Sequence, residues 1–153
     1  MDYKKINGLL VKDYFSKNKS TKLGTAGDNY IIIPEPSFFM VVPSDKMVCD
    51  PNKFLGDIPQ IGLGNILKTI EDKDSFELAE QTGITIKSDW CDAIEFKSVS
   101  GDSTTLINEK IFKLFGKNVS VMIHVENERC PVGIWNEDLS ELLGGVCPIA
   151  KRK

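Results

Sequence analysis

Two short apolar runs separated by prolines set the strongest limit on how this chain can fold. Residues 30–33 are a largely β-branched run that ends at Pro34 and Pro36. Residues 38–42 are a second apolar run, and it ends at Pro43. β-branched and aromatic side chains favour strands, whereas proline is tolerated mainly at strand ends and edges. Both runs are therefore predicted to be buried strands, the first closed by Pro34.

Apolar and polar residues alternate again further along the chain, between turns rich in glycine, aspartate and serine. Alternation with a period of two indicates strands that bury one face. A short additional strand is expected earlier, at residues 47–49. The strands predicted from alternation in the second half are 76–78, 84–87, 93–99, 119–125, 132–135 and 142–149.

The first predicted helix covers residues 6–18, where apolar side chains recur at roughly helical spacing. Its start is expected near Asn7 and Gly8. Residues 8–11 also fit a strand, and the pattern does not decide between the two. The stretch that follows, 16–28, is polar and is interpreted as a solvated connection or the edge of a strand.

Two further helices are predicted. Leu63, Ile66, Leu67 and Ile70 have the apolar spacing of a short amphipathic helix, and Gly62 and Gly64 are interpreted as a loop that enters it. Asn108 is a typical helix-capping residue, and Gly116 is a typical stop signal. The second of these helices is therefore predicted to extend from Asn108 to Phe115.

Length and composition predict one α+β domain over residues 1–153. The chain is long enough for a sizeable core and short for two ordinary domains. Its 41% hydrophobic and 27% charged residues are typical of a globular protein. Glycines and prolines between 56 and 64 mark a midpoint, which suggests halves 1–60 and 61–153. Each half combines a helix with strands, and the sheets are expected to be mostly antiparallel.

The sequence also suggests a cytoplasmic protein without a membrane partner. No apolar run approaches the roughly 20 residues of a membrane-spanning helix, and the first residues lack the apolar core of a signal peptide. Without a secretory signal, disulfides are not expected, so reduced thiols are predicted. The widely spaced cysteines are Cys49, Cys91, Cys130 and Cys147.

Over residues 93–151 the sequence predicts a strand, a short helix and three strands, with residues 106–112 before a turn at Gly116. This order and these segments resemble the repeating half-domain of DNA polymerase sliding clamps. Residues 130–134 resemble the next strand of the family, and 146–149 resemble its closing strand. The closing motif departs from the family, because Cys147 and Ile149 stand where methionine is usual and Ala150 where arginine is usual.

The resemblance implies one clamp-like domain that binds without catalysing a reaction. A clamp chain carries two or three such domains, so this chain would have to form a homo-oligomer to close a ring around double-stranded DNA. The alternative partner is a protein or peptide, bound at a pocket that the family places on the closing strand. The residues carried over to that pocket are Val132, Cys147, Pro148 and Ile149.

The lysines of the predicted helices are the candidate DNA contacts. Lys110, Lys113 and Lys117 recur at spacings typical of one helix face, opposite an apolar stripe. The net charge of −3 excludes a wholly basic nucleic-acid binder but allows a basic face. A solvated surface helix would carry the same pattern, so both interpretations stay open. Near the first helix the weaker candidates are Lys12, Lys17 and Lys19.

No catalytic, metal or cofactor site is predicted. His124, the single histidine, lies in an alternating strand without a metal-ligating residue at suitable spacing. Gly62 and Gly64 lack the rest of a phosphate-binding motif. Two alternatives to the clamp hypothesis remain: a small protein-interaction domain, and a hydrolase that uses loop carboxylates. The carboxylates considered are Glu71, Asp72, Asp74, Asp89, Asp92, Glu137 and Asp138.

Overall fold

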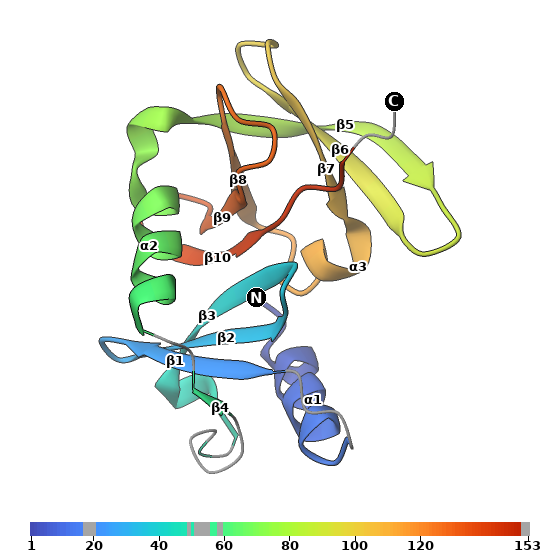
Figure 1. Ribbon diagram of the computed structural model, residues 1–153. Helices are drawn as coiled ribbons and strands as arrows, with labels where there is room; N and C mark the ends of the chain where they lie inside the picture. Colours follow the sequence, from blue (N-terminus) through green and yellow to red (C-terminus); the bar gives the residue numbers. More distant parts are fainter. Residues whose placement is uncertain (17–20, 49, 51–55, 58–59, 151–153) are drawn as a thin grey trace.

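The chain folds into a mixed α+β structure dominated by one β-sheet (Figure 1). The structure is a computed structural model, and it describes residues 1–16, 21–48, 50, 56–57 and 60–150. Its helices are α1 (Tyr3–Tyr14), α2 (Gln60–Glu71) and α3 (Glu109–Phe112). The strands are β1 (Lys22–Ala26), β2 (Asn29–Glu35), β3 (Phe38–Pro43), β4 (Gly56–Asp57), β5 (Phe76–Lys87), β6 (Asp92–Ser98), β7 (Thr104–Asn108), β8 (Val119–His124), β9 (Val132–Asn136) and β10 (Leu142–Val146).

The sheet is antiparallel apart from one short pairing at its edge. Its strand order is β4-β1-β2-β3-β10-β9-β8-β5-β6-β7. The two-residue strand β4 pairs in parallel with β1, and all other neighbours run antiparallel. The expectation of mostly antiparallel strands is therefore confirmed.

The same arrangement of a helix and three strands occurs twice in the sheet. Helix α1 is followed by the meander β1-β2-β3, and α3 is followed by the meander β8-β9-β10. The two meanders join through their third strands, where Phe38 pairs with Val146 and Met40 with Gly144. The order β1-β2-β3-β10-β9-β8 thus reads the same from both ends, while α2 and β5 to β7 stand outside this repetition.

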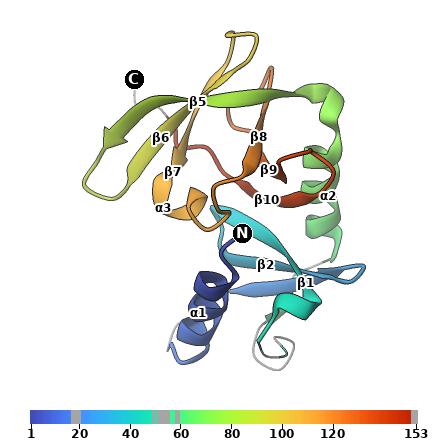
Figure 2. The ribbon, with the colours of Figure 1, turned by 180° about the vertical axis from the view of Figure 1, so that it is seen from behind.

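Each face of the sheet carries its own hydrophobic core. Along β3, Phe38, Met40 and Val42 point into one core, and Phe39 and Val41 point into the other. This alternation is the ordinary geometry of a strand buried on both faces. Helices α1 and α3 cover the first core, whereas α2 covers the second. Figures 1 and 2 show from opposite sides that strands lie between α2 and the other two helices.

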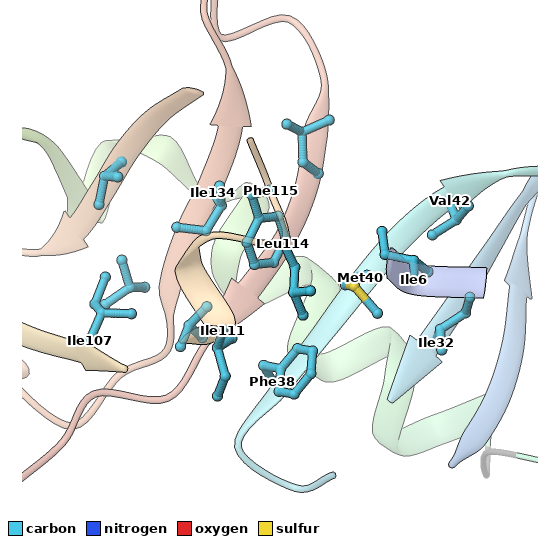
Figure 3. Close-up of a cluster of buried hydrophobic side chains, with 14 of the residues drawn as sticks. Ile6, Ile32, Phe38, Met40, Val42, Ile107, Ile111, Leu114, Phe115 and Ile134 are labelled. Carbon is cyan, nitrogen blue, oxygen red and sulfur yellow. The ribbon is translucent and has the colours of Figure 1, made fainter. Parts of the chain in front are cut away.

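The first core brings the two repeated helices onto the same face (Figure 3). Ile6 of α1 and Phe115, just after α3, are fully buried in it, together with Met40 and Ile134 of the sheet. Burial of such side chains removes apolar surface from water and is the main favourable contribution to folding. The shared core therefore holds α1 and α3 over the same face of the sheet.

Helix α1 begins earlier than the predicted start near Asn7 and Gly8, because its capping residue is Asp2. The Asp2 carboxylate accepts a hydrogen bond from the backbone N–H of Lys5, and the helix begins at Tyr3. Residues 8–11 are helical, so the alternative of a strand there is wrong. Glycine at position 8 is tolerated because it lies on the exposed side of the helix.

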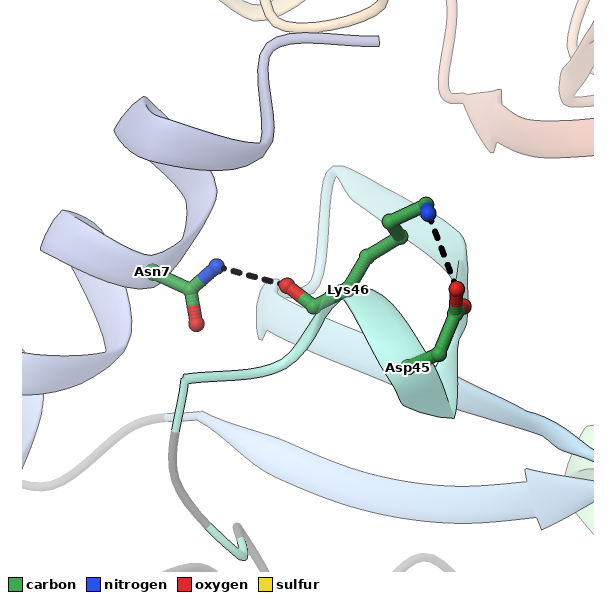
Figure 4. A network of polar contacts seen from close by, with 3 residues as sticks. All are labelled: Asn7, Asp45 and Lys46. Carbon is green, nitrogen blue, oxygen red and sulfur yellow. Dashed lines mark hydrogen bonds and ion pairs between the residues drawn. The ribbon is translucent and has the colours of Figure 1, made fainter.

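Asn7 has a different role: it ties α1 to the chain that follows β3 (Figure 4). Its buried amide donates to the carbonyl oxygens of Tyr3 (2.8 Å) and Lys46 (3.1 Å). Its side-chain oxygen accepts from the backbone N–H of Val48 at 3.0 Å. A buried amide with all these partners holds the helix against the segment that follows β3.

Several predicted boundaries also differ from the structure. Strand β2 continues through Pro34 to Glu35, with an irregular register after Ile32. A 3₁₀ helix (Ser44–Lys46) precedes residues 47–48, which form no strand, and Cys49 lies outside the described residues. Gly62 and Gly64 lie inside α2, which is longer than predicted. The predicted strands 76–78 and 84–87 are parts of the single strand β5, and β7 was not predicted.

The remaining predicted strands are present, although β10 ends at Val146 and not at residue 149, and the helix predicted over 6–18 ends at Tyr14. The strands expected at 30–33, 38–42, 93–99, 119–125, 132–135 and 142–149 correspond to β2, β3, β6, β8, β9 and β10. The stretch 16–28, interpreted as a solvated connection or the edge of a following strand, contains the strand β1. Among the described residues, no helix has both the length and the apolar character needed to cross a membrane.

Candidate nucleic-acid interface

A groove of about 620 Å³ lies on the face of the sheet that α1 and α3 cover. Lys12 lines it from α1, and Lys110 lines it from α3. Thr21, just before β1, and Pro34 and Glu35 of β2 also contribute to its walls. Two of the predicted DNA-contacting lysines, almost one hundred positions apart in sequence, therefore lie at the same groove.

The apolar part of the groove belongs to the first core. Phe38, Ile111 and Leu114 line the groove and are also buried members of that core. Leu9 adds a partly exposed apolar side chain from α1. The groove thus combines an apolar base with charged side chains, and the core packing holds its two helices in place.

Local sequence fixes α3 as a single turn. The Asn108 side chain accepts hydrogen bonds from the backbone N–H groups of Lys110 (2.9 Å) and Ile111 (3.4 Å), as predicted for a capping residue. Gly116 has a φ of +94°, a left-handed conformation that suits glycine and prevents the helix from continuing. The predicted helix 108–115 is therefore shortened to Glu109–Phe112.

The shorter helix changes the relation between the three lysines. Lys110 is in α3, Lys113 is its C-cap residue, and Lys117 follows the break at Gly116. Helical spacing consequently does not place all three on one helix face, contrary to the prediction. All three side chains are nevertheless exposed, and Lys110 alone among them lines the groove.

Ion pairing distinguishes these lysines. The ammonium group of Lys113 lies 2.8 Å from the Glu109 carboxylate, an exposed pair one helical turn apart. No ion pair within the described part of the chain includes Lys12, Lys110 or Lys117. The positive charges of these three lysines are therefore available to an external anion.

The carboxylates at the groove have hydrogen-bond donors of their own. The Asp13 side chain accepts from the backbone N–H of Thr21 at 3.2 Å. The Glu35 side chain accepts from the hydroxyl group of Ser37. Both acids lower the positive potential of the groove, but neither forms an ion pair with Lys12 or Lys110 among the described residues.

The predicted lysines Lys17 and Lys19 lie outside the described residues, so their relation to the groove is not described. Lys22 begins β1 and is exposed. Among the described lysines of α1, Lys12 alone lines the groove.

The residues expected to form a peptide pocket on the closing strand lie in different surroundings. Val132 is buried in the first core, opposite Val146 of β10. Cys147 is exposed, and its backbone N–H donates to the Ser37 carbonyl oxygen at 2.7 Å. Pro148 is partly exposed, and Ile149 donates its backbone N–H to the Leu106 carbonyl oxygen at 2.8 Å. Ile149 lines a separate apolar hollow near β5 and β6.

The residues weighed for catalysis also have structural roles. The Nδ1 atom of His124 accepts from the backbone N–H groups of Glu126 and Asn127, both at 3.1 Å. Hydrogen bonds from Ser140 lower the pKa of the Asp138 carboxyl group. Asp138 and Glu137 lie with Asn118 and Asn136 around an open hollow of about 500 Å³. Within the described residues, no group of three or more His, Cys, Asp or Glu side chains could hold a metal ion.

Sequence reasoning missed the acidic and apolar walls of the groove. Asp13, Glu35 and Leu9 were not singled out, because their roles depend on how α1 packs against the sheet and α3. No signal in the sequence alone indicates that packing.

No protein-family model, curated protein or solved structure matches this chain.

Proposed function

We propose that this chain is a non-catalytic binding domain of the sliding-clamp type, which contacts double-stranded DNA through the groove between α1 and α3. One observation carries the proposal: Lys12 and Lys110 come from two different helices and line one groove, and neither has an ion-pair partner among the described residues. Lysine ammonium groups in such a position attract phosphates by charge, without reading the base sequence.

The repeated topology supports the clamp-type interpretation. Two helix-plus-meander units pair through β3 and β10, and both helices cover the same face of the sheet. In a ring of such domains, that helix-bearing face would line the hole and meet the DNA backbone. The groove lysines lie on this face, so the topology and the charges support the same proposal.

DNA retention at low salt tests the groove directly. Fluorescence anisotropy of a labelled duplex would compare the natural chain with the double variant Lys12→Glu, Lys110→Glu. We expect the variant to bind at least tenfold more weakly, because two phosphate contacts become repulsive. The slope of log K against log salt should fall in magnitude by about 2, since each lost contact removes about 0.9.

The control carries the same change of charge elsewhere. Lys87 ends β5 and Lys97 lies on β6, and both are exposed and outside the groove. The variant Lys87→Glu, Lys97→Glu should retain the natural affinity. Equal weakening in both double variants would indicate an effect of net charge alone, and an unchanged affinity in the groove variant would contradict the proposal.

Encirclement of DNA requires several copies of this chain, so the oligomeric state is a separate test. Light scattering over a range of concentrations, with and without duplex, would report association. A ring predicts a defined multimer. A chain that stays monomeric under all these conditions would contradict the ring and leave only open contact through the groove.

A further inference from the structure

A second concave surface lies on strands β5 to β7, and its lining residues differ from those of the groove. It is an apolar hollow of about 230 Å³ that shares no lining residue with the groove between α1 and α3. Ile86 of β5 pairs with Ala93 of β6 across the hairpin, and both line it. Leu106 of β7 and Ile149 of the C-terminal segment complete its apolar lining.

Ala93 contributes a small, buried side chain to the lining of the hollow. Strand β6 lies between β5 and β7, so Ala93 lies between strands that place the much larger Ile86 and Leu106 at the hollow. Ile149 is held at the β7 side by the hydrogen bond from its backbone N–H to the Leu106 carbonyl oxygen. The hollow is therefore formed by strand pairing and by a fixed chain segment, and not by side chains alone.

Exposed apolar side chains extend the surface beyond the hollow. Trp90, in the turn between β5 and β6, lines the hollow and is 75% exposed. Ile84 is 52% exposed and lies two residues before Ile86, on the same side of the strand. Clustered large apolar side chains at the surface are typical of protein interaction sites, and tryptophan is especially frequent at their centres.

The size of the hollow limits what can bind there. Small-molecule sites have volumes of roughly 300 to 1,000 Å³, which exceed this one. One large apolar side chain fits a space of about 230 Å³ better. The dimensions therefore favour a protein segment that inserts a single anchor residue.

The residues that line the hollow are uncharged, so the charge of the β5–β6 hairpin that carries most of them indicates the character of that segment. Between residues 80 and 97 there are four carboxylates, Glu80, Asp89, Asp92 and Glu95, against two lysines, of which Lys87 lies opposite Asp92 and Lys97 opposite Glu80 in the β5–β6 pairing. The wider stretch 71–102 has nine carboxylates and three lysines, a net charge of −6, although the whole chain carries only −3. Basic residues beside the anchor would complement this charge.

We propose that the hollow on β5 to β7 docks a short segment of another protein, with one large apolar anchor residue flanked by lysines or arginines. The anchor occupies the space between Ile86, Ala93 and Ile149 and contacts Trp90. The flanking cations face the carboxylates of the β5–β6 hairpin. This inference goes beyond the proposed DNA contact and uses residues that the DNA contact does not require.

Labelled peptides test the anchor and the charge separately. A short peptide with a central phenylalanine between lysine pairs would be titrated with the full chain, and its fluorescence anisotropy measured. We expect at least tenfold weaker binding for a peptide with central alanine, and for one with glutamates in place of the lysines. Absence of saturable binding of the basic phenylalanine peptide would overturn the proposal.

Variants of the chain locate the bound peptide. Trp90→Ala and Ile86→Ser should each weaken binding at least tenfold, whereas Val99→Ser should not, because Val99 is an exposed apolar residue outside the hollow. Asp89→Lys should weaken binding more than Asp102→Lys, since Asp102 lies in the turn after β6. Circular dichroism of each variant checks folding, and equal binding by Trp90→Ala would overturn the proposal.

Two further variants separate this site from its alternatives. The double variant Lys12→Glu, Lys110→Glu should bind the peptide normally, because the groove is a different surface. The chain continues after Ala150 with Lys151, Arg152 and Lys153, three positive charges next to the hollow in sequence. If peptide binding appears only after these are replaced by alanine, the tail of the chain itself is the occupant and an external partner is refuted.

Discussion

At the scale of single residues, Asn7 shows how tertiary contacts override helix propensity. Alanine favours a helix more than asparagine does, so propensity alone predicts that Asn7→Ala stabilises α1. Asn7 is buried, however, and bonds Tyr3, Lys46 and Val48. We predict a loss of about 1 to 3 kcal/mol in the free energy of unfolding, measured by urea denaturation, because buried partners lose their hydrogen bonds.

The neighbouring ion pair provides the control for this prediction. Lys46 and Asp45 approach to 2.8 Å, but both side chains are largely exposed (Figure 4). Exposed ion pairs contribute little to the stability of a folded protein, so Asp45→Asn should change the free energy of unfolding by less than about 1 kcal/mol. A larger effect of Asp45→Asn than of Asn7→Ala would contradict the role assigned to the buried amide.

The thiol of Cys130 gives a second prediction at this scale. Burial in the second core, and to a smaller extent the nearby Cys147, raise the pKa of this thiol. A raised pKa leaves less thiolate at a given pH, and only the thiolate reacts with alkylating reagents. At pH 8, alkylation by iodoacetamide followed by peptide mass mapping should be at least tenfold slower in the folded chain than in urea. Equal rates would show that Cys130 is accessible.

At the scale of elements, the sequence predicted strands better than it predicted helix ends. The apolar run 30–33 and the alternation at 132–135 were sufficient to predict strands β2 and β9, because strand periodicity and β-branched side chains are local signals. The sequence wrongly predicted that β2 ends at Pro34. The strand continues to Glu35, because the register with β3 is irregular there and a proline is tolerated. The start of α1 was missed because Asp2 lies before the apolar pattern begins.

Two glycine substitutions test the packing of the elements. A Cβ atom at Gly145 of β10 would lie 2.5 Å from a ring carbon of Phe39 and 2.8 Å from Ile70 of α2. Gly145→Ala should therefore lower the free energy of unfolding by about 1 to 3 kcal/mol. A Cβ atom at Gly8 of α1 meets open space, and alanine is more stable than glycine inside a helix. Gly8→Ala should therefore raise the free energy of unfolding by about 0.5 to 1 kcal/mol. Denaturant midpoints measure both, and the same sign for both would contradict the packing described.

At the scale of the whole molecule, the groove was beyond the reach of sequence reasoning. The candidate residue Lys110 could be named from its own helix, and Lys12 from another. Their meeting depends on the pairing of β3 with β10, which joins residues more than one hundred positions apart. Periodicity reports which face of an element is buried, but it does not report which distant element covers that face.

The β3–β10 seam yields a prediction for the entire chain. Met40 is fully buried at this seam, so Met40→Ala should cost about 2 to 5 kcal/mol of unfolding free energy. Because the seam unites both meanders in one sheet, we expect one cooperative transition. Hydrogen exchange followed by mass spectrometry should show β2 and β6 losing protection together in this variant, while Val99→Ala, at an exposed residue, leaves both unchanged. Loss of protection in β1 to β3 alone would mean that the two meanders fold as independent units and that the seam does not couple them.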